Sequence, residues 1–117
     1  MWNVPFNGLG AALDVTTERL LATSAGVELV RELMQEVIAT AKAIGVQLPP
    51  AIAQQKIDST YSMGAYQTSM QIDRRHGRAM ETEAIIGKPL AAARQAHVVT
   101  PTLTMLHRIL LAVNKAE

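Results

Sequence analysis

The 117-residue sequence predicts an all-α fold with seven or eight helices of uneven length. Apolar residues make up 49% of the chain and aromatic residues only 3%, so the core must consist of Leu, Ile, Val, Ala and Met, which suits packed helices. Apolar residues also recur at steps of three and four, and no stretch of β-branched residues alternates with a period of two. A chain of this length is expected to form a single domain, residues 1–117, around one core.

The first expected helices are short and the third is long. The opening residues are expected to be helical, and the polar cluster at residues 14–17 is typical of a cap that precedes a short helix at 18–21. Ser24 is a candidate N-cap for the longest helix, in which apolar residues from 27 to 44 form one stripe. This stripe predicts a helix that packs one face against the core.

Glycine and proline delimit the later helices. Gly45 is expected to end the long helix in a left-handed conformation, and Pro50 suits the first turn of the next helix, which runs to about Ser62 with Gly64 as its stop. The remaining helices are expected at residues 69–75, 80–86 and 91–96 and after the cap Thr100, with Gly77 and Gly87 as stops for the first two.

Composition and charge exclude several classes of protein. Eleven basic and ten acidic residues give a net charge of +1, so the whole chain shows no preference for nucleic acid or an anionic membrane. The chain has no cysteine, hence no disulfide or thiolate ligand, which is compatible with a reducing cytoplasm. No apolar run approaches the roughly 18 residues that a membrane span needs. We expect a cytoplasmic chain with neither nucleic acid nor membrane as partner.

The opening stretch, MWNVPFNGLG, allows two interpretations. Gly8-Leu9-Gly10 resembles the start of a dinucleotide-binding loop, but Leu13 stands at the third glycine position and no strand precedes it. The alternative is a helix in which Asn3 and Asn7, four residues apart, project from one face. Two such amides can hold a carboxylate or hydroxyl group, or they can be ordinary structural asparagines.

The remaining polar residues give weaker signals. The basic run at residues 74–78 could bind phosphate, although a solvated helix end is the favoured interpretation. His76, His97 and His107 lack the spacing of a metal site, so no metal is predicted. Taken alone, Glu81 is most simply a surface acid.

Several stretches taken together are more informative than any one of them. The sequence resembles the C-terminal domain of the ketopantoate reductase family over essentially its whole length. The stretches that carry the resemblance are residues 2–9, residues 31–37 with Gly45 and Leu48-Pro49, Ser69-Met70 with Asp73, Gly77-Arg78, Glu81, Ile85 and Gly87, and Thr100-Pro101. The resemblance implies a helical bundle of the 6-phosphogluconate dehydrogenase C-terminal-domain type. In the family this domain closes the active-site cleft of a preceding Rossmann domain that binds NADPH.

The resemblance also implies roles for individual residues. Asn3 and Asn7 match asparagines that line the substrate pocket, and Ser69 matches a serine that hydrogen-bonds the substrate carboxylate. Glu81 matches an acid that contacts the cofactor and supports the active site. The family's general acid, a lysine four residues before the first asparagine, falls upstream of Met1 in this register.

These matches imply the isolated substrate-binding domain of an NADPH-dependent 2-dehydropantoate 2-reductase, an oxidoreductase of pantothenate and coenzyme A biosynthesis. Without the Rossmann domain and the lysine, we expect it to fold alone, to bind no cofactor tightly and to be inactive. Its expected partners are a 2-keto acid such as ketopantoate and the missing Rossmann domain, and a second copy of the chain is a further candidate. A free-standing, non-catalytic helical module for interaction or dimerisation remains the alternative.

The sequence departs from the family pattern at Tyr66, at Ala79-Met80, where a Pro-Thr pair is common, and at His97. Tyr66 lies three residues before Ser69, where some members carry an asparagine directed at the substrate, so the preferred 2-keto acid stays open. His97 stands where a glycine usually ends a helix. Either His97 adopts a left-handed conformation, which non-glycine residues disfavour, or the cap differs.

Overall fold

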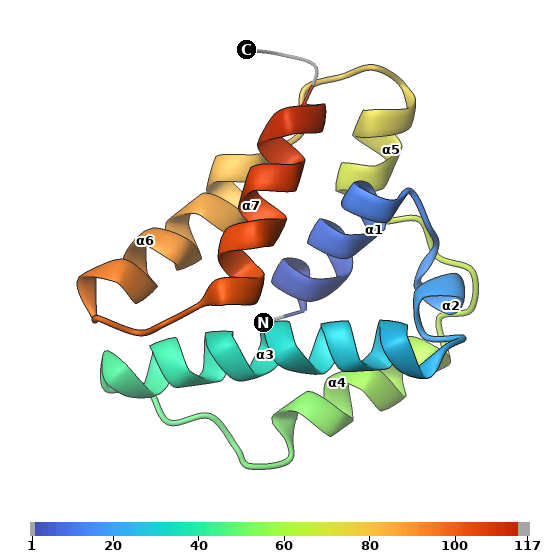
Figure 1. Ribbon diagram of the computed structural model, residues 1–117. Coiled ribbons are helices and arrows are strands. Elements are labelled where there is room, and N and C mark those ends of the chain that lie inside the picture. The colour runs from blue at the N-terminus through green and yellow to red at the C-terminus, as the bar shows by residue number, and fades with distance from the viewer. Residues whose placement is uncertain (1, 115–117) are drawn as a thin grey trace.

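The computed structural model describes residues 2–114, which form seven α-helices and two π-helical turns and contain no strand. The predicted all-α fold is therefore confirmed. The longest helix, α3 (Ser24–Ala43), crosses the molecule, with α4 (Ile52–Tyr61) on one side of it and the other helices largely on the other side (Figure 1). The last helix, α7 (Pro101–Val113), lies in front of α6 (Lys88–Gln95) in this view.

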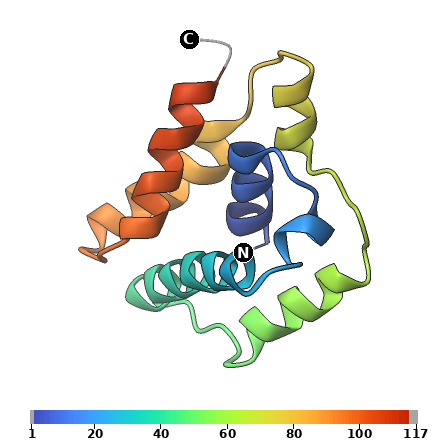
Figure 2. The same cartoon turned by 45° about the vertical axis from the view of Figure 1, so that its right-hand side comes forward.

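The first helical segment is the centre of the fold. A π-helical turn, η1 (Asn3–Asn7), continues directly into α1 (Gly8–Leu13), and every residue from 4 to 11 is buried. Figure 2 shows this segment surrounded by helices from both halves of the chain, including α2 (Thr17–Leu20) and α5 (Ser69–Arg75). The buried apolar side chains of these elements form one cluster, whose largest fully buried members include Phe6, Leu33, Met34, Ile86 and Leu110.

The glycines of the opening stretch serve packing. Gly8 and Gly10 are both helical and buried, so the stretch is not a phosphate-binding loop. A Cβ at Gly8 would lie 2.6 Å from Leu106 Cδ2, and a Cβ at Gly10 would lie 3.1 Å from Thr68 Oγ1. Because these contacts are at or below ordinary van der Waals distance, the two glycines let α7 and the start of α5 approach the first helix closely.

The segment after residue 80 corrects one prediction. Gly87 was expected to separate two short helices, but π-helical turn η2 (Glu83–Gly87) runs without a break into α6. Gly87 has a helical φ of −63°, and a Cβ there would collide with the carboxylate of Glu83. Glycine at this position makes room for a neighbouring side chain and does not end a helix.

Two helix caps also differ from the prediction. Thr23, not Ser24, caps α3, because the Thr23 hydroxyl accepts a hydrogen bond from the Gly26 amide at 3.1 Å. At α7 the N-cap position is Thr100, as expected, but the carboxylate of Glu36 accepts the bonds from the amides of Thr102 and Leu103, at 3.0 and 2.8 Å. The cap of α7 thus comes from α3, and it ties the two helices together.

Left-handed residues end several helices. The glycines at 45, 64 and 77 have φ angles of 87°, 67° and 70°, which confirms them as stops after α3, α4 and α5. His97 has a φ of 59°, so the first of the two alternatives for this residue is correct. Asp14, which follows α1, has a φ of 54° that the sequence did not predict. Aspartate is one of the residues that tolerate this region best.

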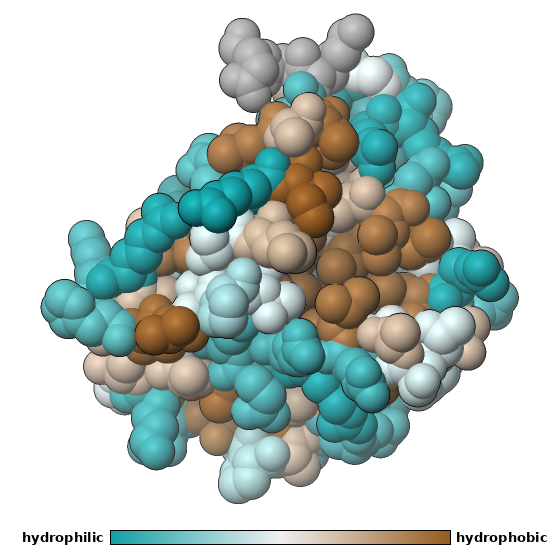
Figure 3. Space-filling view, viewed as in Figure 1, coloured by the Kyte–Doolittle hydropathy of each residue, from teal (hydrophilic) through white to brown (hydrophobic). Residues whose placement is uncertain are grey.

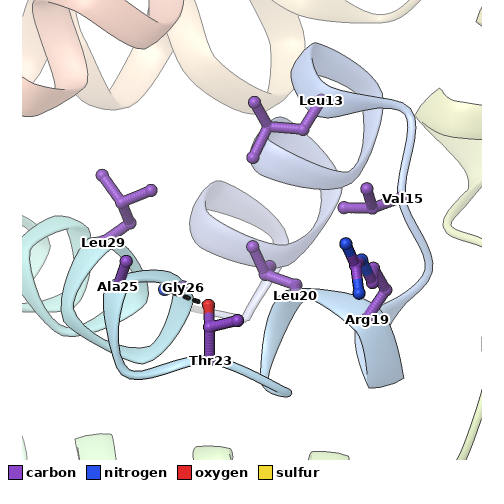
Figure 4. A pocket seen from close by; sticks show the side chains of 8 residues that line it. All are labelled: Leu13, Val15, Arg19, Leu20, Thr23, Ala25, Gly26 and Leu29. Carbon is purple, nitrogen blue, oxygen red and sulfur yellow. Dashed lines mark hydrogen bonds between the residues drawn. The ribbon is translucent and has the colours of Figure 1, made fainter.

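We predict that Gly26→Ala will destabilise the protein by about 2–4 kcal/mol, because overpacking against backbone is poorly relieved. Gly26 lies in the first turn of α3, where that helix passes the end of α2 (Figure 4). A Cβ at Gly26 would overlap the carbonyl oxygen of Leu20. Urea denaturation measures the effect. Ser24→Ala, at an exposed position of the same turn, should change stability by less than about 0.5 kcal/mol. Equal stability of the two variants would contradict this packing.

Candidate functional site

A hydrogen-bonded cluster joins the first helical segment to α5. The side-chain amide of Asn7 donates from Nδ2 to Asn3 Oδ1 at 2.9 Å. The hydroxyl of Ser69 and the backbone amide of Met70 both donate to Asn7 Oδ1, each at 3.2 Å. Asn7 is only 4% exposed, whereas Asn3 and Ser69 are exposed at the surface. The structure therefore brings together three of the four site residues that the sequence predicted.

The backbone amide of Met70 determines how both asparagine side chains are oriented. A backbone N–H can only donate, so the Asn7 atom that faces Met70 must be the oxygen. The Asn7 nitrogen is then directed at Asn3, and the Asn3 atom that meets it must also be an oxygen. The Nδ2 group of Asn3, with its two N–H donors, consequently points away from this bond at an exposed position.

The start of α5 is held in place by local and tertiary contacts. Thr68 caps this helix by accepting a hydrogen bond from the Gln71 amide at 3.3 Å. The same threonine is buried against Gly10 of α1. Ser69 is therefore the first residue of a helix whose end is fixed against α1, which limits its movement relative to Asn7.

An aromatic cluster adjoins these polar groups along the chain. Trp2, next to Asn3, stacks on Phe6 with ring centroids 5.1 Å apart. Tyr66, three residues before Ser69, meets Trp2 edge-on at 6.2 Å and is 46% exposed. The indole N–H of Trp2 donates to the Thr60 hydroxyl at 2.9 Å. The sequence points to Tyr66 but not to Trp2, because nothing in the local pattern shows which aromatic residues will meet.

Glu81 does not join the hydrogen-bonded cluster in the part of the chain that the structure describes. Its side chain is exposed, and its carbonyl accepts a bond from the amide of Ile85 at 3.1 Å. The following turn, η2, packs against η1, so Glu81 begins a segment that lies next to the asparagine-bearing turn. Thr82, beside Glu81, is 2% exposed, and its hydroxyl has no hydrogen-bond partner within residues 2–114.

The basic run contributes mostly to structure. Arg74 donates from Nη1 to the carbonyls of Ala11 and Ala12, at 2.6 and 3.0 Å, and so caps the C-terminal end of α1. Arg75 pairs with Asp14 at 2.8 Å, and Arg78 pairs with Asp73 at 3.1 Å. The interpretation as a solvated helix end is wrong for Arg74, which is half-buried and tied to α1.

The described residues, 2–114, contain neither a cluster of metal ligands nor a helix that could span a membrane. Within this range no group of three or more His, Asp or Glu side chains is placed to hold a metal ion. His107, which the sequence left unassigned, contacts the carboxylate of Glu83 at 2.8 Å. No helix in the described range is both long and apolar enough to cross a membrane.

Comparison with known proteins identifies the family that shares this architecture. Residues 1–114 match the family described as "Ketopantoate reductase PanE/ApbA C terminal". A 2-dehydropantoate 2-reductase from a Nostoc species is 40% identical over 107 residues, which are 92% of this chain and 34% of that protein. The crystal structure of 2-dehydropantoate 2-reductase from Geobacter metallireducens superposes with a TM-score of 0.93 at 37% identity, covering 97% of this chain and 38% of that one. A ketopantoate reductase from Staphylococcus aureus, described as dimeric, gives a TM-score of 0.81 at 25% identity, with 96% and 39% covered.

The fold and the matched region define a helical C-terminal domain of a class of longer proteins. The chain spans about a third of the length of the curated relatives it matches. It belongs to the ketopantoate reductase family and corresponds to the C-terminal domain of that family. The resemblance seen in the sequence is thereby confirmed.

The ion pair at the end of α1 gives stability a defined pH dependence. A hydrogen bond from Arg75, and to a smaller extent one from Gln71, hold the pKa of the Asp14 carboxyl below its ordinary value of 3.8. Because the pKa is lower in the folded protein than in the unfolded chain, ionised Asp14 stabilises the fold above the unfolded pKa. That contribution is lost as the pH falls through the folded pKa.

We predict that Asp14→Asn will lower the urea midpoint slightly at pH 7 and will match the wild type at about pH 2. Asparagine also tolerates the left-handed conformation at this position, so the substitution removes the charge with little backbone strain. Asp58→Asn is the control, because Asp58 is an exposed carboxylate bonded to the neutral amide of Gln54. A midpoint difference for Asp14→Asn that persists unchanged to about pH 2 would contradict the assignment.

Proposed function

We propose that this chain is the substrate-binding domain of an NADPH-dependent ketopantoate reductase, which reduces 2-dehydropantoate to pantoate. The observation that carries the proposal is the hydrogen-bonded cluster of Asn3, Asn7 and Ser69. Its orientation leaves the Asn3 amide donors directed away from the cluster at an exposed position. Carboxylate and keto oxygens accept hydrogen bonds, so a 2-keto acid matches the groups that the cluster presents.

Each residue of the cluster has a distinct role in this proposal. Asn3 donates to an oxygen of the substrate, while buried Asn7 holds Asn3 and Ser69 in register. The Ser69 hydroxyl now donates to Asn7, and by rotating about its Cα–Cβ bond it can donate to a substrate carboxylate instead. A preorganised set of donors of this kind orients the keto acid with little rearrangement on binding.

Gly8 and Gly10 are buried in a helix, so this glycine stretch does not form a nucleotide-binding loop. We therefore assign the binding of NADPH to the N-terminal Rossmann domain of the family, with the exposed carboxylate of Glu81 available to accept a hydrogen bond from the cofactor. When bound, NADPH supplies the hydride for the keto carbon. Residues 1–117 supply substrate binding and closure of the cleft. The lysine expected to donate the proton falls outside them.

The proposal is tested by joining residues 1–117 to the N-terminal two-thirds of the Nostoc relative, which is 40% identical in this domain. The chimera should oxidise NADPH in the presence of 2-dehydropantoate, whereas residues 1–117 alone should not. In the chimera, Ser69→Ala should lower kcat/KM by about 10- to 100-fold, because a hydrogen bond to a charged group contributes roughly 1.5–3 kcal/mol.

Ser62→Ala is the matched control for this experiment. Ser62 is exposed after the end of α4, where its hydroxyl donates to the carbonyl of Ser59 at 2.7 Å. Its removal should leave kcat/KM unchanged. Equal activity of the Ser69 and Ser62 variants, or enzyme-like turnover by residues 1–117 alone, would refute the proposal.

Tyr66 should influence which 2-keto acid is preferred. Its exposed ring meets Trp2, the chain neighbour of Asn3, edge-on. We infer that this ring forms an apolar border of the substrate site. The two test substrates are 2-dehydropantoate, which carries a hydroxyl group, and the aromatic 2-keto acid phenylglyoxylate. We predict that Tyr66→Asn in the chimera will shift the ratio of their kcat/KM values about tenfold in favour of 2-dehydropantoate, because an amide can hydrogen-bond a substrate hydroxyl. Tyr61→Asn, at a 56% exposed tyrosine on α4, should not change this ratio. An unchanged ratio in the Tyr66 variant would show that Tyr66 does not contribute to substrate selectivity.

A further inference from the structure

The connection between α4 and α5 is an exposed stretch without regular secondary structure. It runs from Ser62 to Thr68 and passes beside α2 in both ribbon views (Figure 1, Figure 2). Residues 62–67 are exposed except for Gly64, which is half-buried. The hydrophobic side chains of the face in Figure 3 gather over α1, α3 and α7, whereas this connection lies at the edge of the same view. Apolar burial therefore contributes little to holding the connection in place.

One buried threonine makes three hydrogen bonds to this connection. Thr17 begins α2 and is 2% exposed. Its hydroxyl donates to the carbonyl of Gly64 at 2.9 Å and accepts from the amide of Tyr66 at 3.3 Å. Its backbone amide donates to the carbonyl of Tyr66 at 2.9 Å. Among residues 2–114, every long-range hydrogen bond of the stretch 62–67 is one of these three.

The hydroxyl of Thr17 is not needed by its own helix. Thr16 caps α2, because the Thr16 hydroxyl accepts a hydrogen bond from the amide of Arg19 at 3.2 Å. The Tyr66 amide also donates to the Gly64 carbonyl at 2.9 Å, which closes a three-residue turn. A hydroxyl both donates and accepts, so Thr17 bonds to both ends of this turn at once. The Thr17 side chain therefore serves the connection.

Tyr66 is held at its backbone by Thr17 and at its ring by Trp2. The two rings meet edge-on, with centroids 6.2 Å apart. Trp2 is itself fixed, because it stacks on Phe6 and donates from its indole N–H to Thr60. The Tyr66 ring is 46% exposed, so its own packing holds it only partly. The position of its backbone therefore decides whether the ring stays against Trp2.

We propose that Thr17 is a positioning residue for Tyr66. The hydroxyl and the amide of Thr17 fix the backbone of Tyr66 and thereby keep its ring against Trp2. This role rests on the proposed function, in which the Tyr66 ring borders the substrate site. Loss of the hydroxyl releases the ring from that border, so Thr17 influences the choice between an aromatic and a hydroxylated 2-keto acid. At 2% exposure, Thr17 acts through Tyr66 and not by contact with a substrate.

Nuclear magnetic resonance of residues 1–117 tests the position of the ring without any substrate. The wild-type chain should give nuclear Overhauser effects between the ring protons of Tyr66 and those of the Trp2 indole, because the two rings are in contact. Thr17→Val removes the hydroxyl and keeps the branched shape, so it should weaken these effects several-fold. Thr17→Ser keeps the hydroxyl and should restore them.

Thr40→Val is the matched control. Thr40 is 7% exposed, and its hydroxyl donates to the carbonyl of Glu36 within α3 at 2.9 Å. This variant also loses a buried hydroxyl but should keep the contact between Tyr66 and Trp2. Nuclear Overhauser effects that are as strong in Thr17→Val as in the wild type, or as weak in Thr40→Val as in Thr17→Val, would overturn the proposal.

Amide hydrogen exchange of the wild-type chain gives a test that needs no variant. The amides of Thr17 and Tyr66 both donate hydrogen bonds, whereas the amide of Gln67 has no partner within residues 2–114. After correction for intrinsic rates, the two bonded amides should exchange at least about tenfold more slowly than that of Gln67. A Tyr66 amide that exchanges as fast as the Gln67 amide would overturn the proposal even if Thr17→Val does not fold.

The role in selectivity is tested in the chimera with 2-dehydropantoate and phenylglyoxylate. Thr17→Val should shift the ratio of their kcat/KM values several-fold in favour of 2-dehydropantoate, because the released ring no longer forms an apolar border. Thr17→Ser and Thr40→Val should keep the wild-type ratio. In the Tyr66→Asn background, Thr17→Val should change the ratio no further, because the two substitutions act through the same ring. A merely structural role of Thr17 would lower kcat/KM equally for both acids.

The outcomes separate this role from the proposed function. An active chimera whose ratio does not respond to Thr17→Val, or responds equally in the Tyr66→Asn background, would overturn the role of Thr17 and leave the proposed function intact. A chimera inactive toward both acids would refute the proposed function, and with it the role in selectivity. The nuclear Overhauser effects would still decide whether Thr17 positions Tyr66.

Discussion

The arrangement of the candidate site depends on one buried side-chain amide. Asn7 is buried at the centre of the fold, and its side-chain oxygen accepts a hydrogen bond from the backbone amide of Met70. A buried amide without partners would be costly, so these bonds fix both the docking of α5 on the first helix and the direction in which Asn3 points. The direction of the exposed Asn3 amide is thus determined by a backbone N–H in the interior.

The first helical segment carries different chemistry on its different sides. Its glycines let neighbouring helices approach, its asparagines form the polar cluster, and its leucines line an apolar groove between α1, α3 and α7. Both π-helical turns also occur in the segments that the proposed site uses, one bearing Asn3 and Asn7 and the other following Glu81. Such turns are rare and are frequent at functional sites, where the wider turn redirects side chains.

The sequence predicted the parts of this structure that depend on local order. Helix number and the stops at Gly45, Gly64 and Gly77 follow from backbone preferences of single residues. The left-handed conformation of His97 was one of two alternatives that the family resemblance left open. The grouping of Asn3, Asn7 and Ser69 could be predicted only through the family resemblance. Contacts between distant residues were missed: the carboxylate of Glu36 caps α7 from another helix, and the amide of Met70 fixes Asn7. The prediction that Gly87 ends a helix was wrong. Glycine at this position leaves room for the Glu83 side chain, a contact that no local sequence pattern reveals.

The chain has a single tryptophan, and it lies beside the polar cluster. Trp2 is half-buried, stacked on Phe6, and bonded through its indole N–H to Thr60 of α4. Indole emission depends on the polarity and hydrogen bonding around the ring. Residues 1–117 therefore contain a built-in optical probe with one chromophore of its kind. Its emission should report both occupancy of the neighbouring polar cluster and any separation of α4 from the opening turn, without a label.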